Sequence, residues 1–184
     1  MSLLADENNS VADQSPTMNK RRKTESIRIR PMEHSLPLSL DSSYIAFYTT
    51  ILDRPDSTIQ DRRAALKYFR YILGDPDTSH DAAAAIRKEG GIVSLLTNLK
   101  IVRFSESSEF DDRSNMAREI FLVLVLFAAT SEAKSLIENG IGTIVAFLAY
   151  DDCHVRELAA SCIGNLADGN RDLILKQESV ITSL

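Results

Sequence analysis

Two cysteines and a neighbouring histidine are the residues of this chain with the most familiar metal chemistry. Cys153 is followed directly by His154, and Cys162 lies eight residues beyond His154. Adjacent residues do not share a helix face, and this separation spans about 12 Å along a helix at about 1.5 Å per residue. One ion cannot be reached from both positions, so we expect no metal site and no cofactor. Both thiols are expected to be free and packed as small apolar groups.

No other set of residues has the spacing of a catalytic site. The run "GIGTI", from Gly140 to Ile144, lacks the third glycine and the preceding strand of a dinucleotide-binding loop. It is interpreted as a helix stop followed by a turn. The acids of "ESSEFDD", residues 106–112, have no histidine partner and are expected in a solvated loop. We therefore predict that the protein is not an enzyme.

One asparagine stands out in the run "ASCIGNLADGNRDLIL". Asn165 occupies a position near a helix end where an aliphatic side chain would be unremarkable. A primary amide offers two donors and an acceptor, which suits contact with a polypeptide backbone. The sequence leaves two interpretations open: an amide that bonds to a neighbouring loop of the same chain, and an amide that faces a ligand.

A dense basic cluster lies in the run "NKRRKTESIRIR" near the N-terminus. Its members are Lys20, Arg21, Arg22, Lys23, Arg28 and Arg30. The surrounding segment 1–36 is polar and shows no apolar period, so we expect it to be disordered. Such clusters are typical of nuclear localisation or polyanion-binding signals, and a solvated tail is the alternative.

Composition limits the classes of protein that fit. A chain of 184 residues, 44% of them hydrophobic, can form one domain with a sizeable core. The net charge of -5 argues against a direct nucleic-acid binder. The longest apolar run, "IFLVLVLFAA" from Ile120, is about half of the roughly 20 residues that a membrane span needs. We expect this run to be a fully buried core helix, and the protein to occupy the cytoplasm and nucleus without a membrane partner.

The elements that must position these residues are helices. No stretch of 37–184 alternates apolar and polar residues as a strand would, and helical patterns follow one another. Asp41 is a candidate cap for the first helix, and Gly90 is expected to end another in the left-handed conformation. Residues 103–115 are expected to form a surface loop, and a further helix is expected to end at Asn139-Gly140.

The helical pattern repeats along the chain. The run "AIRKEGGIVSLLTNL" (85–99) resembles "SLIENGIGTIVAFL" (135–148). Removing 103–115 leaves a period near the roughly 40 residues expected for helical solenoids. A single unit cannot bury its own apolar face, so neighbouring units are expected to stack into one core over 37–184. The predicted units are 42–75, 77–130 and 131–169, followed by the start of another at 170–184.

These units resemble the armadillo repeat, and within that superfamily the chain is similar to the importin-α family. The run "ASCIGNLADGNRDLIL" resembles that family's helix ending in Gly-Asn-(Val/Ile)-Ala-Gly-Asp, followed by Arg-Asp and two hydrophobic residues. The order of a basic segment, a polar linker and repeats agrees too. The resemblance implies an all-α, right-handed superhelical solenoid of about three repeats.

In the importin-α family, tryptophans and asparagines four residues apart line a concave groove. The asparagines bond to the backbone of an extended peptide, and the tryptophans hold lysine stems near acidic residues. By this resemblance Asn165 is a groove asparagine, Asp168 a groove acid, and Ser161 stands at a tryptophan position. Leu122 and Leu126 hold the tryptophan and asparagine positions of the preceding repeat. Because the chain contains no tryptophan, we expect a weakened groove.

The resemblance implies a function in protein transport. It implies an adaptor that binds the basic nuclear localisation peptides of cargo proteins. By the same resemblance, the basic N-terminal cluster is a segment that binds importin-β or an autoinhibitory segment. The alternative is an armadillo scaffold that binds another protein and has no role in nuclear import.

Overall fold

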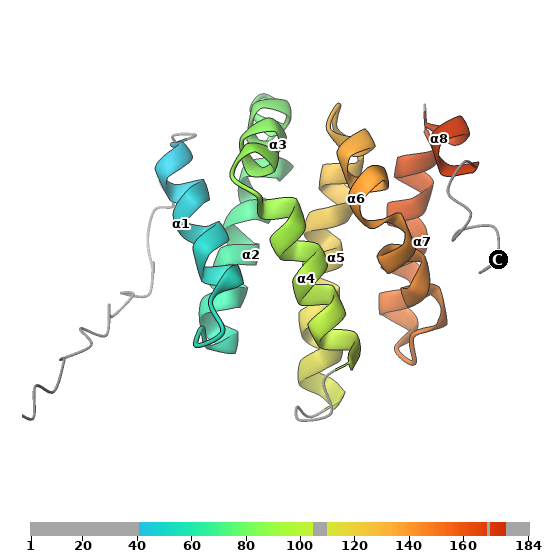
Figure 1. Ribbon diagram of the computed structural model, residues 1–184, viewed down its shortest axis with the longest axis horizontal. Helices are drawn as coiled ribbons and strands as arrows, with labels where there is room; N and C mark the ends of the chain where they lie inside the picture. The colour runs from blue at the N-terminus through green and yellow to red at the C-terminus, as the bar shows by residue number, and fades with distance from the viewer. Residues whose placement is uncertain (1–40, 105–109, 169, 176–184) are drawn as a thin grey trace, which may run out of the picture. The chain divides into compact units, whose positions relative to one another are not determined.

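Every regular element in the described residues is helical. The computed structural model of the protein describes residues 41–104, 110–168 and 170–175 (Figure 1). Within them lie eight α-helices, one 3-10 turn and no strand, which confirms the all-α prediction. The elements are α1 (Ser42–Asp53), α2 (Ile59–Gly74), α3 (Ser79–Lys88), α4 (Gly91–Phe104), α5 (Phe110–Ala128), α6 (Ala133–Val145), η1 (Ala146–Ala149), α7 (Cys153–Ala167) and α8 (Arg171–Leu175).

Polar caps and one glycine set several helix ends. Asp41 caps α1 by accepting a hydrogen bond from the Ser43 amide at 2.9 Å, as the sequence predicts. Thr58 and Asp61 form a reciprocal capping box at the start of α2, which satisfies backbone donors that the first turn leaves unpaired. Gly90 has φ of +78°, so the predicted left-handed position between α3 and α4 is confirmed.

The predicted surface loop over 103–115 is wrong for most of its length. Helix α4 continues to Phe104 and α5 begins at Phe110, while residues 105–109 lie outside the described part of the chain. The polar residues belong to a helix start: Asp111 and Asp112 occupy the first turn of α5, where negative charge favours the helix dipole. High polarity here marks the first turn of a helix and not a loop.

The predicted helix end at Asn139-Gly140 is also wrong, because α6 runs through this pair without a break. Gly140 has a packing role. A Cβ atom built there would lie 2.4 Å from Cδ1 of Leu96 on α4. The absence of a side chain lets α4 and α6 approach closely, so "GIGTI" is helix interior and not a turn.

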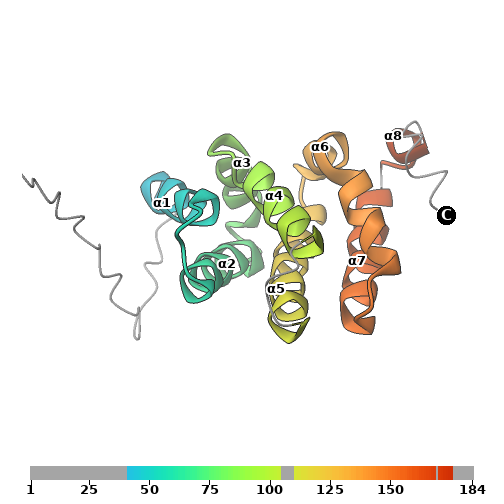
Figure 2. The same ribbon diagram turned by 60° about the horizontal axis from the view of Figure 1, so that its bottom comes forward.

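The longer helices form two layers. In one layer α5 packs between α2 and α7, and in the other α4 packs between α1 and α6. Figure 2 shows α2, α5 and α7 as one row and α1, α4 and α6 as another. The largest buried side chains include Tyr68 and Phe69 of α2, Phe121 and Phe127 of α5, and Phe147 of η1. This arrangement leaves one side of α2, α5 and α7 facing away from the core.

The apolar run from Ile120 is only partly the buried helix that the sequence predicts. Ile120, Phe121 and Phe127 are fully buried. Leu122 and Leu126 are instead partly exposed, and Leu126 packs against the margin of the core. No helix of the described residues is long and apolar enough to cross a membrane.

Candidate functional site

The outward side of α7 carries the polar residues that the sequence singles out. Val155, Ala159, Cys162 and Leu166 recur at helical spacing and are buried against α5 and its neighbours. Ser161 and Asp168 are exposed on the other side, and Asn165 is partly buried between them. Asp168 is the residue after the last turn of α7, three positions beyond Asn165.

The Asn165 amide joins α7 to α5. Its Nδ2 donates to the backbone carbonyl of Val125 at 3.0 Å. Val125 lies in the last turn of α5, where the final four carbonyls of a helix lack a partner within the helix. The amide therefore supplies a donor to a carbonyl at the end of a neighbouring helix. One interpretation from the sequence was a bond to a loop of the same chain, and the observed partner is a helix end instead. Among the described residues, none donates to Asn165 Oδ1.

The five predicted groove residues come from two adjacent helices. Leu122 and Leu126 lie one turn apart on α5, and Ser161 and Asn165 have the same spacing on α7. Helices α5 and α7 pack along each other, and the Asn165 bond ends beside Leu126. Helix α2 packs on the other side of α5. We call the outward side of α2, α5 and α7 the α2–α5–α7 face, and define it by Lys67, Tyr71, Leu122, Leu126, Ser161, Asn165 and Asp168.

An ion pair fixes the start of α7 against α5. Arg118 bonds to the Asp152 carboxylate, and Oδ1 of Asp152 also accepts from the amides of His154 at 2.9 Å and Val155 at 3.1 Å. The hydrogen bond from Arg118, aided by these two amides, lowers the pKa of Asp152 below its usual range. Asp152 is recognisable from sequence as a helix cap. Its partner Arg118 lies 34 residues away and carries no sequence signal.

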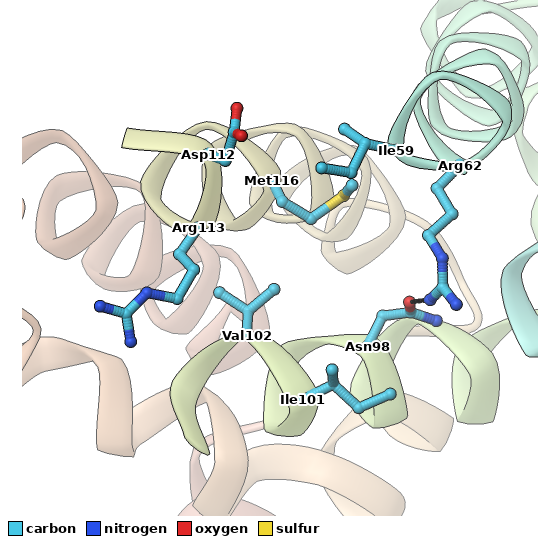
Figure 3. Close-up of a pocket in the computed structure, with 8 residues that line it drawn as sticks. All are labelled: Ile59, Arg62, Asn98, Ile101, Val102, Asp112, Arg113 and Met116. Carbon is cyan, nitrogen blue, oxygen red and sulfur yellow. Dashed lines mark hydrogen bonds between the residues drawn. The ribbon is translucent and has the colours of Figure 1, made fainter. Parts of the chain in front are cut away.

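A hollow that was not predicted from the sequence lies between α2, α4 and α5 (Figure 3). It has a volume of about 180 Å³ and apolar walls made by Ile59, Ile101, Val102 and Met116. Arg62 and Asn98 meet at one side of it, and Arg113 lies at the other. Asp112 also lines the hollow, and no serine, cysteine or histidine is among its lining residues.

The Arg62–Asn98 pair secures the end of α1. Asn98, buried on α4, donates through Nδ2 to the Leu52 carbonyl at 3.0 Å and the Ser94 carbonyl at 2.8 Å. Arg62 donates to Asn98 Oδ1 and, at 2.8 Å, to the carbonyl of Arg54. Because these carbonyls at the end of α1 need donors, the pair is explained by its structural role.

The two cysteines have different environments. Cys162 is buried, and desolvation raises the pKa of its thiol to about 12. Cys153 is exposed in the first turn of α7, so the prediction that it packs as an apolar group is wrong. No cluster of three or more metal-ligating side chains occurs in the described ranges. The predicted basic cluster, Lys20 to Arg30, lies outside these ranges.

Comparisons with known proteins bear on the fold alone. No protein-family model matches the chain, and no curated protein matches it. A solved structure of an engineered protein, a target of the Northeast Structural Genomics Consortium, superposes with a TM-score of 0.56 at 19% sequence identity. The match covers 76% of this chain and 51% of the engineered one, so this chain spans about half of that protein's length. The likeness supports the all-helical arrangement.

Proposed function

We propose that this protein is an armadillo-type adaptor that binds an extended peptide across the α2–α5–α7 face. The stacked units form a solenoid of about three repeats in this proposal, with α2, α5 and α7 as the last helix of each. One observation carries it: the Asn165 amide is held between α5 and α7 while no described residue donates to its oxygen. An amide fixed in this way is prepared to accept a peptide N–H.

The surroundings of Asn165 suit an extended chain. Its Oδ1 can accept from the peptide backbone, which is a contact that tolerates many peptide sequences. Leu122 and Leu126 offer aliphatic surface beside it, and Asp168 lies one turn further along α7 for a basic side chain. Ser161 stands where an aromatic slot would strengthen binding. The face therefore fits weak binding of a peptide with a basic residue near Asp168.

A titration with three proteins tests this function. A short lysine-containing peptide, long enough to cross α5 and α7, is titrated against the parent, Asn165→Ala and Ser161→Trp. Loss of one amide bond should weaken binding by about 1 kcal/mol, or about fivefold. Ser161→Trp should strengthen it, because an aromatic face on a lysine stem adds about 0.5–2 kcal/mol. If all three proteins bind the peptide with equal affinity and Asn165→Ala has lower thermal stability, the amide only links α5 to α7 and does not bind peptide.

Nuclear import is one form of this function. The resemblance to the importin-α family and the basic cluster at Lys20 to Arg30 favour cargo proteins with basic peptides, importin-β as receptor, and a cycle between cytoplasm and nucleus. The absence of tryptophan favours the second candidate, a scaffold that binds another protein without a role in import. Binding of purified importin-β to the full chain, or its failure to bind, separates the two.

A further inference from the structure

The outward side of α2 is basic, although the chain as a whole carries a net charge of -5. Arg63, Lys67 and Arg70 recur at helical spacing and lie on one stripe. Lys67 is exposed, the Arg70 side chain is 43% exposed and Arg63 is partly buried. The other side of α2 is core, with Ala65, Leu66, Tyr68, Phe69, Ile72 and Leu73 buried.

Most of this positive charge lacks a counter-charge. Arg70 lies 3.5 Å from Glu119 of α5, an ion pair that also shows the outward sides of α2 and α5 to be adjacent. In the described part of the chain, neither Arg63 nor Lys67 forms an ion pair. Cations that recur about one turn apart on one side of a helix favour an anionic ligand.

The basic stripe is in register with the predicted peptide contacts. Tyr71 is 42% exposed and is followed directly by a buried residue. Leu126 on α5 and Asn165 on α7 are also each followed directly by a buried residue, so the three residues occupy equivalent positions. Lys67, Leu122 and Ser161 each lie four positions earlier. Lys67 therefore falls on α2 at the position of Ser161 on α7, so a peptide that crosses Asn165 and Leu126 continues past Lys67.

The α7 end of the face carries two exposed acids, beside the exposed Arg156, whose guanidinium donates to the Tyr150 and Asp151 carbonyls. Glu157 of α7 and Asp168, which directly follows α7, are exposed, and Nδ1 of His154 lies 3.4 Å from Oε2 of Glu157. Positive charge therefore lies on α2, the carboxylates of Glu157 and Asp168 lie at the α7 end, and Leu122 and Leu126 of α5 lie between them, with Glu119 paired to Arg70. A peptide that is basic along its whole length would place positive charge against Lys67, which opposes binding.

We propose that the peptide bound on this face is of mixed charge, with acidic residues where it crosses α2 and a basic residue beside Asp168. The inference rests on the proposed function and specifies its ligand. The arrangement selects against uniformly basic peptides, because repulsion at α2 offsets attraction at α7.

Three labelled peptides test the charge preference. They share one lysine-containing centre and carry an extension of three Glu, three Ser or three Lys, placed in turn at each end because the direction of binding is open. Fluorescence anisotropy at low salt should show the Glu-extended peptide binding the parent about fivefold more tightly than the Ser-extended one. The Lys-extended peptide should bind most weakly, and added salt should reduce the differences.

Two charge-reversed proteins locate the effect. Arg63→Glu with Lys67→Glu should invert the peptide order. The control, Lys88→Glu with Lys100→Glu, makes the same change in net charge at exposed positions on α3 and α4 and should keep the parent order. Circular dichroism checks that each protein folds. If the first double variant does not fold, the single change Lys67→Gln should still lower the preference for Glu over Ser.

The outcomes separate this inference from the function beneath it. Equal binding of all three peptides, still weakened by Asn165→Ala, overturns the charge inference and leaves the function standing. If the order of peptide affinities also inverts in the control variant, the effect comes from the net charge of the protein, and the charge inference is overturned. No binding of any peptide to the parent overturns both.

Discussion

Replacing Gly140 by alanine tests the close approach of α4 and α6. The added Cβ would lie 2.4 Å from Cδ1, 2.5 Å from Cδ2 and 3.0 Å from Cγ of Leu96. Carbon atoms at ordinary contact are about 3.5–4.0 Å apart, so Leu96 or the backbone of α6 must move by about 1 Å. Leu96 is only 4% exposed and has little free space to enter.

Two effects of opposite sign determine the result. Alanine in a helix interior is favoured over glycine by about 0.8–1 kcal/mol. Overpacking a buried contact costs about 1–3 kcal/mol. Since all three close atoms belong to one buried side chain, we expect the overpacking to prevail. Gly140→Ala should lower the free energy of unfolding by about 1 kcal/mol, or the melting temperature by about 4 °C.

Urea unfolding followed by circular dichroism measures this change, and α7 supplies a matched control. Gly164 is also inside a helix, but nothing lies within 4 Å of a Cβ built there. Gly164→Ala should therefore raise the free energy of unfolding by about 0.5–1 kcal/mol. In a Leu96→Ala background, Gly140→Ala should no longer destabilise, because the clash is gone. If Gly140→Ala stabilises the parent as much as Gly164→Ala does, the reasoning is refuted.

Three other predictions concern the links between helices and the N-terminal cluster. Asn98→Ala should lower the free energy of unfolding by about 1–3 kcal/mol, because it leaves buried carbonyls with fewer donors; an unchanged urea midpoint would contradict this. The pKa of Asp152 is lowered in the folded state, so its contribution to stability is present above its unfolded pKa and is lost as pH falls through the folded value. Melting temperatures measured below about pH 4 should accordingly fall less for Asp152→Asn than for the parent, relative to their values at pH 7; parallel curves would count against the Arg118 pair. Changing residues 20–23 to alanine should weaken importin-β binding, and binding to the parent should weaken steeply with salt. If neither the substitutions nor the salt changes the affinity, the basic cluster does not bind importin-β.

Local sequence signals predicted much of the fold. Asp41 and Gly90 mark helix ends through their own hydrogen-bonding and backbone preferences, and both positions are confirmed. These features depend on residues within a few positions of one another, so the sequence carries them directly.

Contacts between distant segments were not predictable in the same way. From the sequence alone, Gly140 is interpreted as a helix end. Its packing role depends on contact with Leu96, 44 positions earlier in the chain. The Asn165 amide has its partner at Val125, 40 positions away. The polar run over 110–115 forms the first turns of α5, with Asp111 exposed and Ser114 buried. For Gly140 and Asn165 the decisive neighbour comes from another helix, and only packing reveals it.

Mapping a bound peptide by nuclear magnetic resonance tests the central claim most directly. The backbone amides of the ¹⁵N-labelled full chain and the side-chain amide of Asn165 are followed while the Glu-extended, lysine-containing peptide is added. We expect saturable shifts that concentrate on α2, α5 and α7, including Lys67, Leu126 and Asn165. Shifts confined to α1, α4 and α6, or none at saturating peptide, would contradict peptide binding on the α2–α5–α7 face.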